Sequence, residues 1–257
     1  MTTARNRFAG RTALVTGAGS GIGRTVALAF AAEGAQVVVA GRRPEPLAQT
    51  VRLIEEQGGK ALAVSADVSL AADADALVRA AVEHFGSLDV AVNNAGVFRG
   101  GQPLADLPED DWHSQLATNV TGVYLALQAQ IRQMRTQPAG GAIVTVSSTF
   151  GLHATSPGAA AYSATKAAVT ALSRGAALDH IRDGVRINVV SPGATETSMS
   201  LQPGETEPER AERARATLPL GRIATTQEVA AAVLYLASDD AAAVVGTDLV
   251  VDSGGSL

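Results

Sequence analysis

Tyr162 and Lys166 are the residues of this 257-residue chain whose types and spacing most directly suggest chemistry. They lie four positions apart in an Ala-rich stretch of helical character, so we expect both side chains on one helix face, about 6 Å apart. A free phenol has a pKa of about 10, and an adjacent ammonium is expected to stabilise the phenolate and lower that pKa. Tyr162 is therefore a candidate acid–base group. Lys60 is the only other lysine.

A glycine-rich loop stands far upstream of this pair. Residues 16–23 read T-G-A-G-S-G-I-G, directly after a short apolar run and before a predicted helix over 24–32. Glycine allows a tight turn and close approach of a ligand, and a helix N-terminus offers free N–H groups to an anion. The loop therefore predicts a site for a dinucleotide pyrophosphate. Its expected contacts are Gly17, Ser20, Gly21 and Ile22.

The residues after the second apolar run bear on which dinucleotide binds. A Rossmann domain that selects NAD usually carries an acid there, about twenty residues beyond the glycine loop, and this chain has Gly41. Arg42 and Arg43 follow, and a guanidinium can bind a ribose 2′-phosphate through two hydrogen bonds. The sequence thus favours NADP(H) over NAD(H). The alternative is that both arginines are ordinary solvated surface.

Taken together, these motifs resemble the short-chain dehydrogenase/reductase family. The chain contains T-G-x-x-x-G-I-G, N-N-A-G at 93–96, Y-x-x-x-K at 162–166 and V-D-S-G-G at 251–255, close to the family's V-D-G-G. They occur in the family order and extend over almost the whole chain, in the manner of 3-oxoacyl-carrier-protein reductases. The resemblance implies a Rossmann-type fold that interconverts a carbonyl and a secondary alcohol by hydride transfer.

Further site residues follow from the resemblance. Ser148, three residues before Gly151, is expected to polarise the substrate oxygen, with Ser147 as the competing choice. Asn119 is expected to hold a water beside Lys166 in a proton relay. The other implied cofactor contacts are Asp67 and Val68 at the adenine, Asn94, Ala95 and Gly96 along the cofactor, Pro192, Gly193, Thr195 and Thr197 at the nicotinamide, and Tyr162 and Lys166 themselves.

Seven short runs rich in Val, Ala and Ile must position these side chains. The runs are 12–16, 36–40, 61–65, 88–92, 142–147, 186–191 and 248–251. They are continuously apolar, as strands covered by helices on both faces require. The stretches between the runs carry residues typical of helix ends: Pro44 near the start of one, and Gly34 and Gly58 past the ends of two others. The sequence predicts an α/β fold with a doubly wound parallel sheet.

We expect one domain over 1–257 with a single interruption. Residues 196–218 break the pattern with Pro203, Gly204, Pro208 and a Glu/Arg-rich stretch, which is typical of a substrate lid inserted into the fold. The acidic and basic residues there are nearly balanced, so a solvated amphipathic helix and a charged-substrate clamp both remain open.

Composition narrows the partners. A formal net charge of -5 gives no basic field for nucleic acid, and no apolar run is long enough to span a membrane. The absence of cysteine and of an apolar signal region within residues 1–10 favours a cytoplasmic protein. The four histidines are dispersed, so we expect no metal site. His153 borders the expected substrate region, and we interpret it as loop surface.

Three alternative functions compete with an NADP(H)-dependent reductase. One is an NAD(H)-dependent alcohol dehydrogenase of the same family. Another is a sugar-nucleotide epimerase or dehydratase, which shares Y-x-x-x-K but usually has a longer substrate domain. The third is a non-catalytic dinucleotide-binding scaffold. A small carbonyl or alcohol is the expected partner, the family implies a homotetramer, and the sequence does not identify the substrate.

Overall fold

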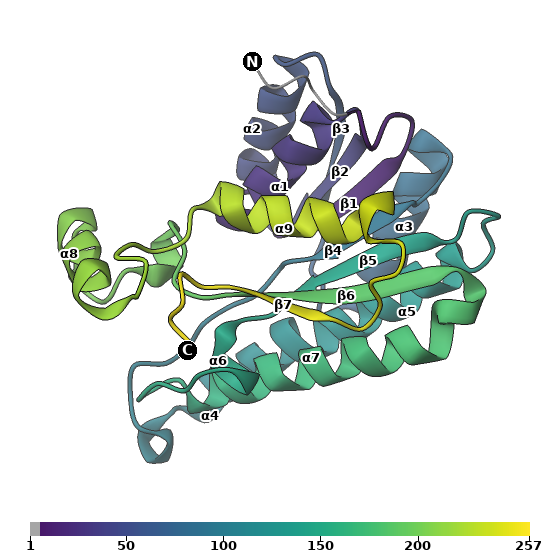
Figure 1. Ribbon diagram of the computed structural model, residues 1–257. Helices are drawn as coiled ribbons and strands as arrows, with labels where there is room; N and C mark the ends of the chain where they lie inside the picture. The colour runs from purple at the N-terminus through teal and green to yellow at the C-terminus, as the bar shows by residue number, and fades with distance from the viewer. Residues whose placement is uncertain (1–5) are drawn as a thin grey trace.

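The computed structural model describes residues 6–257 and is built around a seven-stranded sheet (Figure 1). The strands are β1 (Thr12–Thr16), β2 (Gln36–Gly41), β3 (Lys60–Ser65), β4 (Val90–Asn93), β5 (Gly141–Val146), β6 (Val185–Pro192) and β7 (Asp248–Val251). Their order is β3-β2-β1-β4-β5-β6-β7, and every neighbouring pair is parallel. The predicted Rossmann-type fold is confirmed. The order reverses between β1 and β4, which is where such sheets bind ligands.

The predicted strands agree with the observed ones to within two residues at each end. The largest difference is at β4, which begins at Val90 rather than at Leu88. Leu88 is buried, but the Gln137 side chain bonds both of its backbone groups, Oε1 accepting from the Leu88 N–H and Nε2 donating to its carbonyl, each over 2.9 Å. The apolar run therefore begins before the strand, because Leu88 pairs with a side chain instead of a neighbouring strand.

Helices cover both faces of the sheet, as the continuous apolar runs require (Figure 1). Helices α1 (Gly21–Ala32), α2 (Pro44–Glu55) and α9 (Thr226–Ala237) bury their apolar residues on one face, and α3 (Ala71–Phe85), α5 (Gly122–Met134) and α7 (Ala160–His180) on the other. Alternate strand residues serve the two cores: Val37 and Val39 face the first, and Val38 the second. Helix α1 begins three residues before the predicted position.

Shorter elements complete the chain. They are η1 (Leu104–Asp106), α4 (Glu109–Gln115), the π-helix η2 (Leu116–Thr121), α6 (Thr149–Leu152), η3 (Ile181–Asp183), η4 (Ser198–Ser200), α8 (Glu207–Thr217) and η5 (Asp239–Ala241). Among the described residues, none of the helices combines the length and apolar character needed to cross a membrane. The first five residues, part of the segment in which the sequence shows no secretory signal, lie outside the described part of the chain.

The chain leaves the layered body of the fold where the sequence pattern breaks. After β6 it forms η4 and α8, and α8 stands apart from both helical layers (Figure 1). The helix begins with a capping box in which Thr206 and Glu209 satisfy each other's backbone N–H groups. Only Arg210 and Ala214 of α8 are buried. We call residues 196–218 the lid segment.

Candidate active site

A cleft of about 990 Å³ runs along the carboxyl ends of the strands, from the glycine loop to the lid segment. With the exception of Asn119, every site residue expected from the sequence lines it. These residues are Gly17, Ser20, Gly21, Ile22, Arg42, Arg43, Asp67, Val68, Asn94, Ala95, Gly96, Ser148, Tyr162, Lys166, Pro192, Gly193, Thr195 and Thr197. The fold thus brings together segments that are up to 180 positions apart in sequence.

The glycine loop is too closely packed to accept side chains. Gly17 has a φ of +67°, and a Cβ there would lie 2.8 Å from the Asn94 amide nitrogen. A Cβ on Gly23 would lie 2.3 Å from the Gly17 carbonyl oxygen. Asn94 supports the loop by donating from Nδ2 to the Thr16 carbonyl over 2.9 Å. Ser20 precedes α1 in an extended conformation without a side-chain cap, so the first N–H groups of the helix remain free for an anion.

Two exposed guanidinium groups stand beyond the end of β2. Arg42 and Arg43 both line the cleft. The last residue of β2 is Gly41, so the strand does not end in the acid that is usual in NAD-selective domains. Asp67 is nearby, and its Oδ1 accepts hydrogen bonds from the Ser69 N–H and hydroxyl over 3.0 and 2.7 Å. These bonds, with a smaller contribution from the Arg42 charge, lower the pKa of Asp67. This end of the cleft can accommodate a phosphate-bearing ribose.

The reacting groups lie at the N-terminal half of α7. Tyr162 and Lys166 are 9% and 5% exposed, and the Lys166 ammonium donates to the Val146 carbonyl over 2.9 Å. Its nitrogen lies 5.7 Å from the centroid of the Tyr162 ring. Ser148 lies close enough to the Tyr162 hydroxyl to lower the pKa of the phenol, and the Phe98 ring packs edge-on against the phenol with centroids 5.1 Å apart. A phenol, a hydroxyl and an ammonium therefore converge on one side of the cleft.

The pKa of Tyr162 departs from the value expected from the sequence. Burial raises it to about 12, and the hydrogen bond with Ser148 acts in the opposite direction with a smaller effect. Burial also lowers the pKa of Lys166 to about 8. The expected lowering of the phenol pKa by the ammonium is wrong for this arrangement, because burial dominates and Lys166 is not among the groups that shift the pKa of Tyr162.

The two adjacent serines differ in their surroundings. The Ser147 hydroxyl donates to the Lys166 carbonyl over 3.0 Å and accepts from Thr170 over 2.9 Å, so it is part of the packing between β5 and α7. Ser148 is the N-cap of α6, where its oxygen accepts from the Phe150 N–H, and it also contacts Tyr162. The geometry favours Ser148 as the group that faces a substrate oxygen.

Asn119 lies in the π-helix and is 1% exposed. Its Oδ1 accepts from the Val97 N–H over 2.8 Å, and its Nδ2 donates to the Val97 carbonyl and to Thr165 Oγ1 over 2.9 and 3.1 Å. A Cβ on Gly96 would contact both Asn119 Oδ1 and the Lys166 nitrogen. Asn119 thus fixes the loop after β4 beside Lys166 and does not itself line the cleft.

Within the lid segment, one arginine of α8 is bonded to Thr197, a residue expected at the nicotinamide. The buried Arg210 donates from Nη1 to the Thr197 carbonyl and to Ser200 Oγ, each over 3.1 Å. The Thr197 methyl lies 3.2 Å from where a Cβ on Gly21 would stand, so the start of the lid segment also touches the glycine loop. Thr195 is buried and donates to the Gly193 carbonyl.

Several cleft residues have no counterpart among the residues expected from the sequence. They include Phe98, Phe150, Pro157, Glu196, Met199, Leu201, Gln202, Pro203 and Arg213. They come from three separate loops and share no spacing, so no motif marks them. Phe98 alone carried a usable signal, because it comes two residues after Gly96 at the ligand-binding edge of the sheet.

His153 occupies a more specific position than the loop surface expected from the sequence. Its Nε2 lies 2.7 Å from Asp248 Oδ2, and Asp248 Oδ1 accepts from the Ser191 hydroxyl over 2.6 Å. The ring is 28% exposed and does not line the cleft. His153 therefore ties the loop after α6 to the start of β7.

Comparison with known proteins extends these observations. Residues 17–256 match the family model described as enoyl-(acyl carrier protein) reductase. The chain is 39% identical over 262 residues to a short chain dehydrogenase/reductase of Aspergillus oryzae, covering 100% of both proteins. It is 41% identical over 254 residues to the A-factor type gamma-butyrolactone 1'-reductase of Streptomyces virginiae, covering 99% of this chain and 98% of that protein.

The fold comparison agrees with the sequence comparison. A short chain dehydrogenase of Burkholderia cenocepacia, whose crystal structure is a complex with NADP, superposes with a TM-score of 0.89 at 34% identity. The match covers 98% of this chain and 100% of that one. The cleft described above therefore belongs to a fold that holds a nicotinamide dinucleotide in a similar protein.

Proposed function

The chain belongs to the short-chain dehydrogenase/reductase family, and on that premise we propose that it interconverts a carbonyl and a secondary alcohol using NADP(H). One observation carries the proposal: Tyr162, Ser148 and Lys166 meet at one end of a cleft that begins at the glycine loop. The similar reductase of Streptomyces virginiae supports a reductive role.

The residues of the cleft fit a nicotinamide dinucleotide. The uncapped start of α1 and the side-chain-free face of Gly17 suit a pyrophosphate, and Thr195 and Thr197 line the same cleft, with the Thr197 methyl beside Gly21. When bound, the nicotinamide supplies or accepts the hydride. The protein's part is to bind, to orient and to move a proton.

In reduction, Tyr162 donates its phenol proton to the substrate oxygen. Burial raises its pKa to about 12, so the phenol is protonated at neutral pH, which is the form that reduction requires. Ser148 donates a hydrogen bond to the same oxygen as negative charge develops there. Lys166 places a positive charge 5.7 Å from the phenol ring and stabilises the phenolate left after proton transfer. Asn119 keeps the neighbouring loop in place.

Replacing Tyr162 tests this mechanism. Tyr162→Phe removes only the hydroxyl, and we expect kcat to fall by about 10³-fold with NADPH affinity retained. Tyr124→Phe, at an exposed position on α5, is the matched control. The assay uses ketones, 3-oxoacyl thioesters and secondary alcohols with both cofactors. A parent protein that binds NADPH and turns over none of them would instead support the scaffold alternative.

Cofactor preference is tested separately at Arg42. We expect Arg42→Ala to lower the ratio of kcat/KM with NADPH to that with NADH by about tenfold, because a charge-assisted bond to the 2′-phosphate is lost. Arg52→Ala, an exposed change on α2 outside the cleft, controls for altered net charge. An unchanged ratio in Arg42→Ala would favour the NAD(H)-dependent alternative.

A further inference from the structure

The lid segment presents a mostly uncharged surface to the cleft. Met199, Leu201 and Pro203 line it, together with Gln202. On the other side of the cleft, Phe98, Phe150 and Pro157 add further apolar surface. Among the described residues, Arg213 is the one cationic lid side chain that reaches this lining. Whether its charge is available to a substrate therefore affects which carbonyl compounds the cleft accepts.

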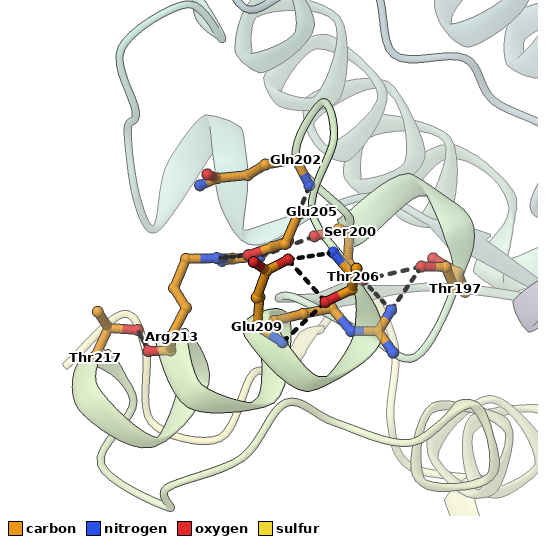
Figure 2. Close-up of polar contacts among 9 residues, drawn as sticks. Thr197, Ser200, Gln202, Glu205, Thr206, Glu209, Arg213 and Thr217 are labelled. Atoms are coloured by element: carbon orange, nitrogen blue, oxygen red, sulfur yellow. Dashed lines mark hydrogen bonds and ion pairs between the residues drawn. The ribbon is translucent and has the colours of Figure 1, made fainter.

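The Glu205 carboxylate forms a two-point ion pair with the Arg213 guanidinium (Figure 2). Arg213 Nε donates to Glu205 Oε1 over 2.6 Å, and Nη2 donates to Oε2 over 2.8 Å and to the Ser200 carbonyl over 3.1 Å. The Gln202 N–H also donates to Glu205 Oε2 over 2.9 Å. The Glu205 side chain is 9% exposed, whereas that of Arg213 is 32% exposed. The carboxylate is thus held inside the lid, and Arg213, which lines the cleft, is the more exposed partner.

A second ion pair, within α8, differs from the pair of Glu205 and Arg213 in its exposure. Glu212 and Arg215 are three residues apart, and their side chains are 74% and 67% exposed. Such a surface ion pair contributes little to folding stability. Neither residue lines the cleft. The hydrogen bond from Arg213 lowers the pKa of Glu205 to about 2, so Glu205 is charged at any ordinary assay pH.

We propose that Glu205 is a specificity-determining residue: it neutralises Arg213, so that the cleft accepts uncharged carbonyl substrates and discriminates against keto acids. A substrate carboxylate that approached Arg213 would have to displace a two-point carboxylate partner and would meet its negative charge. Glu196, the other charged lid residue at the cleft, is also an acid. An uncharged ketone meets neither cost and gains apolar contact. The inference rests on the proposed carbonyl chemistry.

The experiment compares two ketones that differ by one charge, methyl 4-oxocyclohexanecarboxylate and 4-oxocyclohexanecarboxylate. For the parent protein with NADPH we expect kcat/KM for the ester to exceed that for the acid by about tenfold or more. Glu205→Gln keeps a hydrogen-bond acceptor for Arg213 but removes the negative charge. It should shift the ester-to-acid ratio toward the acid by about tenfold or more.

Two further variants separate charge from structure. Glu212→Gln makes the same change in the exposed pair and should leave the ratio unaltered. Adding Arg213→Gln to Glu205→Gln should return the ratio toward the parent value, because the uncovered positive charge is gone. Ester turnover retained within a few-fold in Glu205→Gln shows that the lid remains folded. Dissociation constants of both ketones for the Tyr162→Phe protein saturated with NADPH, followed by cofactor fluorescence, give the same comparison without turnover.

The outcomes distinguish this inference from the proposed function. A parent preference for the acid, or an unchanged ratio in Glu205→Gln, would overturn the role of Glu205 while leaving the carbonyl chemistry intact. Failure of both ketones to bind any variant would also overturn it, since the cleft would then not accept an uncharged cyclic ketone. Turnover of no carbonyl or alcohol with either cofactor would instead reject the proposed function.

Discussion

Lys166 places an ammonium where the protein interior favours the neutral amine. It has one hydrogen-bond acceptor, the Val146 carbonyl, and burial lowers its pKa to about 8. The neighbouring Tyr162 shows the same physics with the opposite sign, because burial favours its neutral phenol. Burial therefore lowers folding stability whenever either residue is charged, and we propose that the pair is kept for proton transfer.

Lys166→Met should separate stability from activity. At pH 7 the buried charge of Lys166 destabilises the folded parent by about 3 kcal/mol, the free energy that corresponds to its pKa shift. The variant lacks this cost but leaves the Val146 carbonyl without its partner, which costs about 1–3 kcal/mol. We expect an unfolding midpoint equal to or above that of the parent and activity lowered by about 10²-fold or more.

The pH dependence of this difference has a defined sign. The unfolded lysine binds its proton more tightly than the folded one, so the penalty in the parent is full below pH 8 and disappears as the pH rises to the unfolded value of 10.5. Any stability advantage of Lys166→Met should therefore shrink over that range. Lys60→Met, at an exposed position of β3, should show no such trend. A large loss of stability in Lys166→Met at pH 7 would contradict the prediction.

Tyr162 should ionise at a higher pH than a free phenol. Its pKa of about 12 lies above the usual value because the phenol is buried. In the cofactor-free protein, the phenolate absorbance of Tyr162→Phe should match that of the parent up to a pH of about 10.5 and differ only above it. Absorbance lost from the variant at lower pH would show that the ammonium dominates.

Among the elements, α8 depends on few interactions with the body of the protein. Its start is fixed locally by the Thr206 and Glu209 capping box, a signal that the T-x-x-E spacing carries in the sequence. Arg210 and Arg213 join the helix to the start of the lid segment, Arg210 through the Thr197 carbonyl and Arg213 through the Ser200 carbonyl. Arg210 thus connects α8 to a residue that we assign to the nicotinamide.

Arg210→Leu should loosen this attachment. The loss of two hydrogen bonds to Thr197 and Ser200 is expected to raise the dissociation constant for NADPH by about tenfold, measured by cofactor fluorescence. Proteolysis within the lid segment should become faster in the same variant. Arg215→Leu changes an exposed arginine of the same helix and should affect neither measurement. Equal effects of the two changes would indicate only a general loss of helix stability.

At the scale of the whole molecule, the sheet order determines where the cleft and the free edges lie. β1 and β4 are neighbours at the centre of the sheet. From β1 the strands are added toward one edge and from β4 toward the other, and the cleft lies at this change of direction. β3 and β7 are the two edges, and β7 is half-exposed along its whole length. An edge strand presents unpaired backbone groups, which proteins cover or use for assembly.

We predict a homotetramer with β7 at an interface between subunits. Sedimentation equilibrium should give four times the 26.1 kDa chain mass. Leu249 and Val251 pack against the core below, so Val250, which lies between them, points to the other side of the strand. Val250→Lys should therefore lower the assembled mass with little loss of folding. A monomeric parent at micromolar concentration would contradict the prediction.

Much of the fold and the site could be predicted from the sequence because the relevant signals are local. Seven apolar runs predicted the strands, and the rule that parallel strands place ligands at their carboxyl ends put the glycine loop, Asn94 and Pro192 at one edge. The four-residue spacing of Tyr162 and Lys166 is a property of a single helix. Each of these features depends on neighbouring positions or on a motif of fixed spacing.

The tertiary structure alone decided features that depend on burial and on distant partners. Sequence spacing could not show that burial dominates the pKa of Tyr162, that Ser147 is used in packing, or that Glu205 pairs with Arg213. The pKa of a phenol follows from the low dielectric of the packed interior, and the availability of a charge follows from which side chain reaches it first. The sequence therefore determined which chemical groups reach the site, and the packing of the lid segment decided that Arg213 is paired with Glu205.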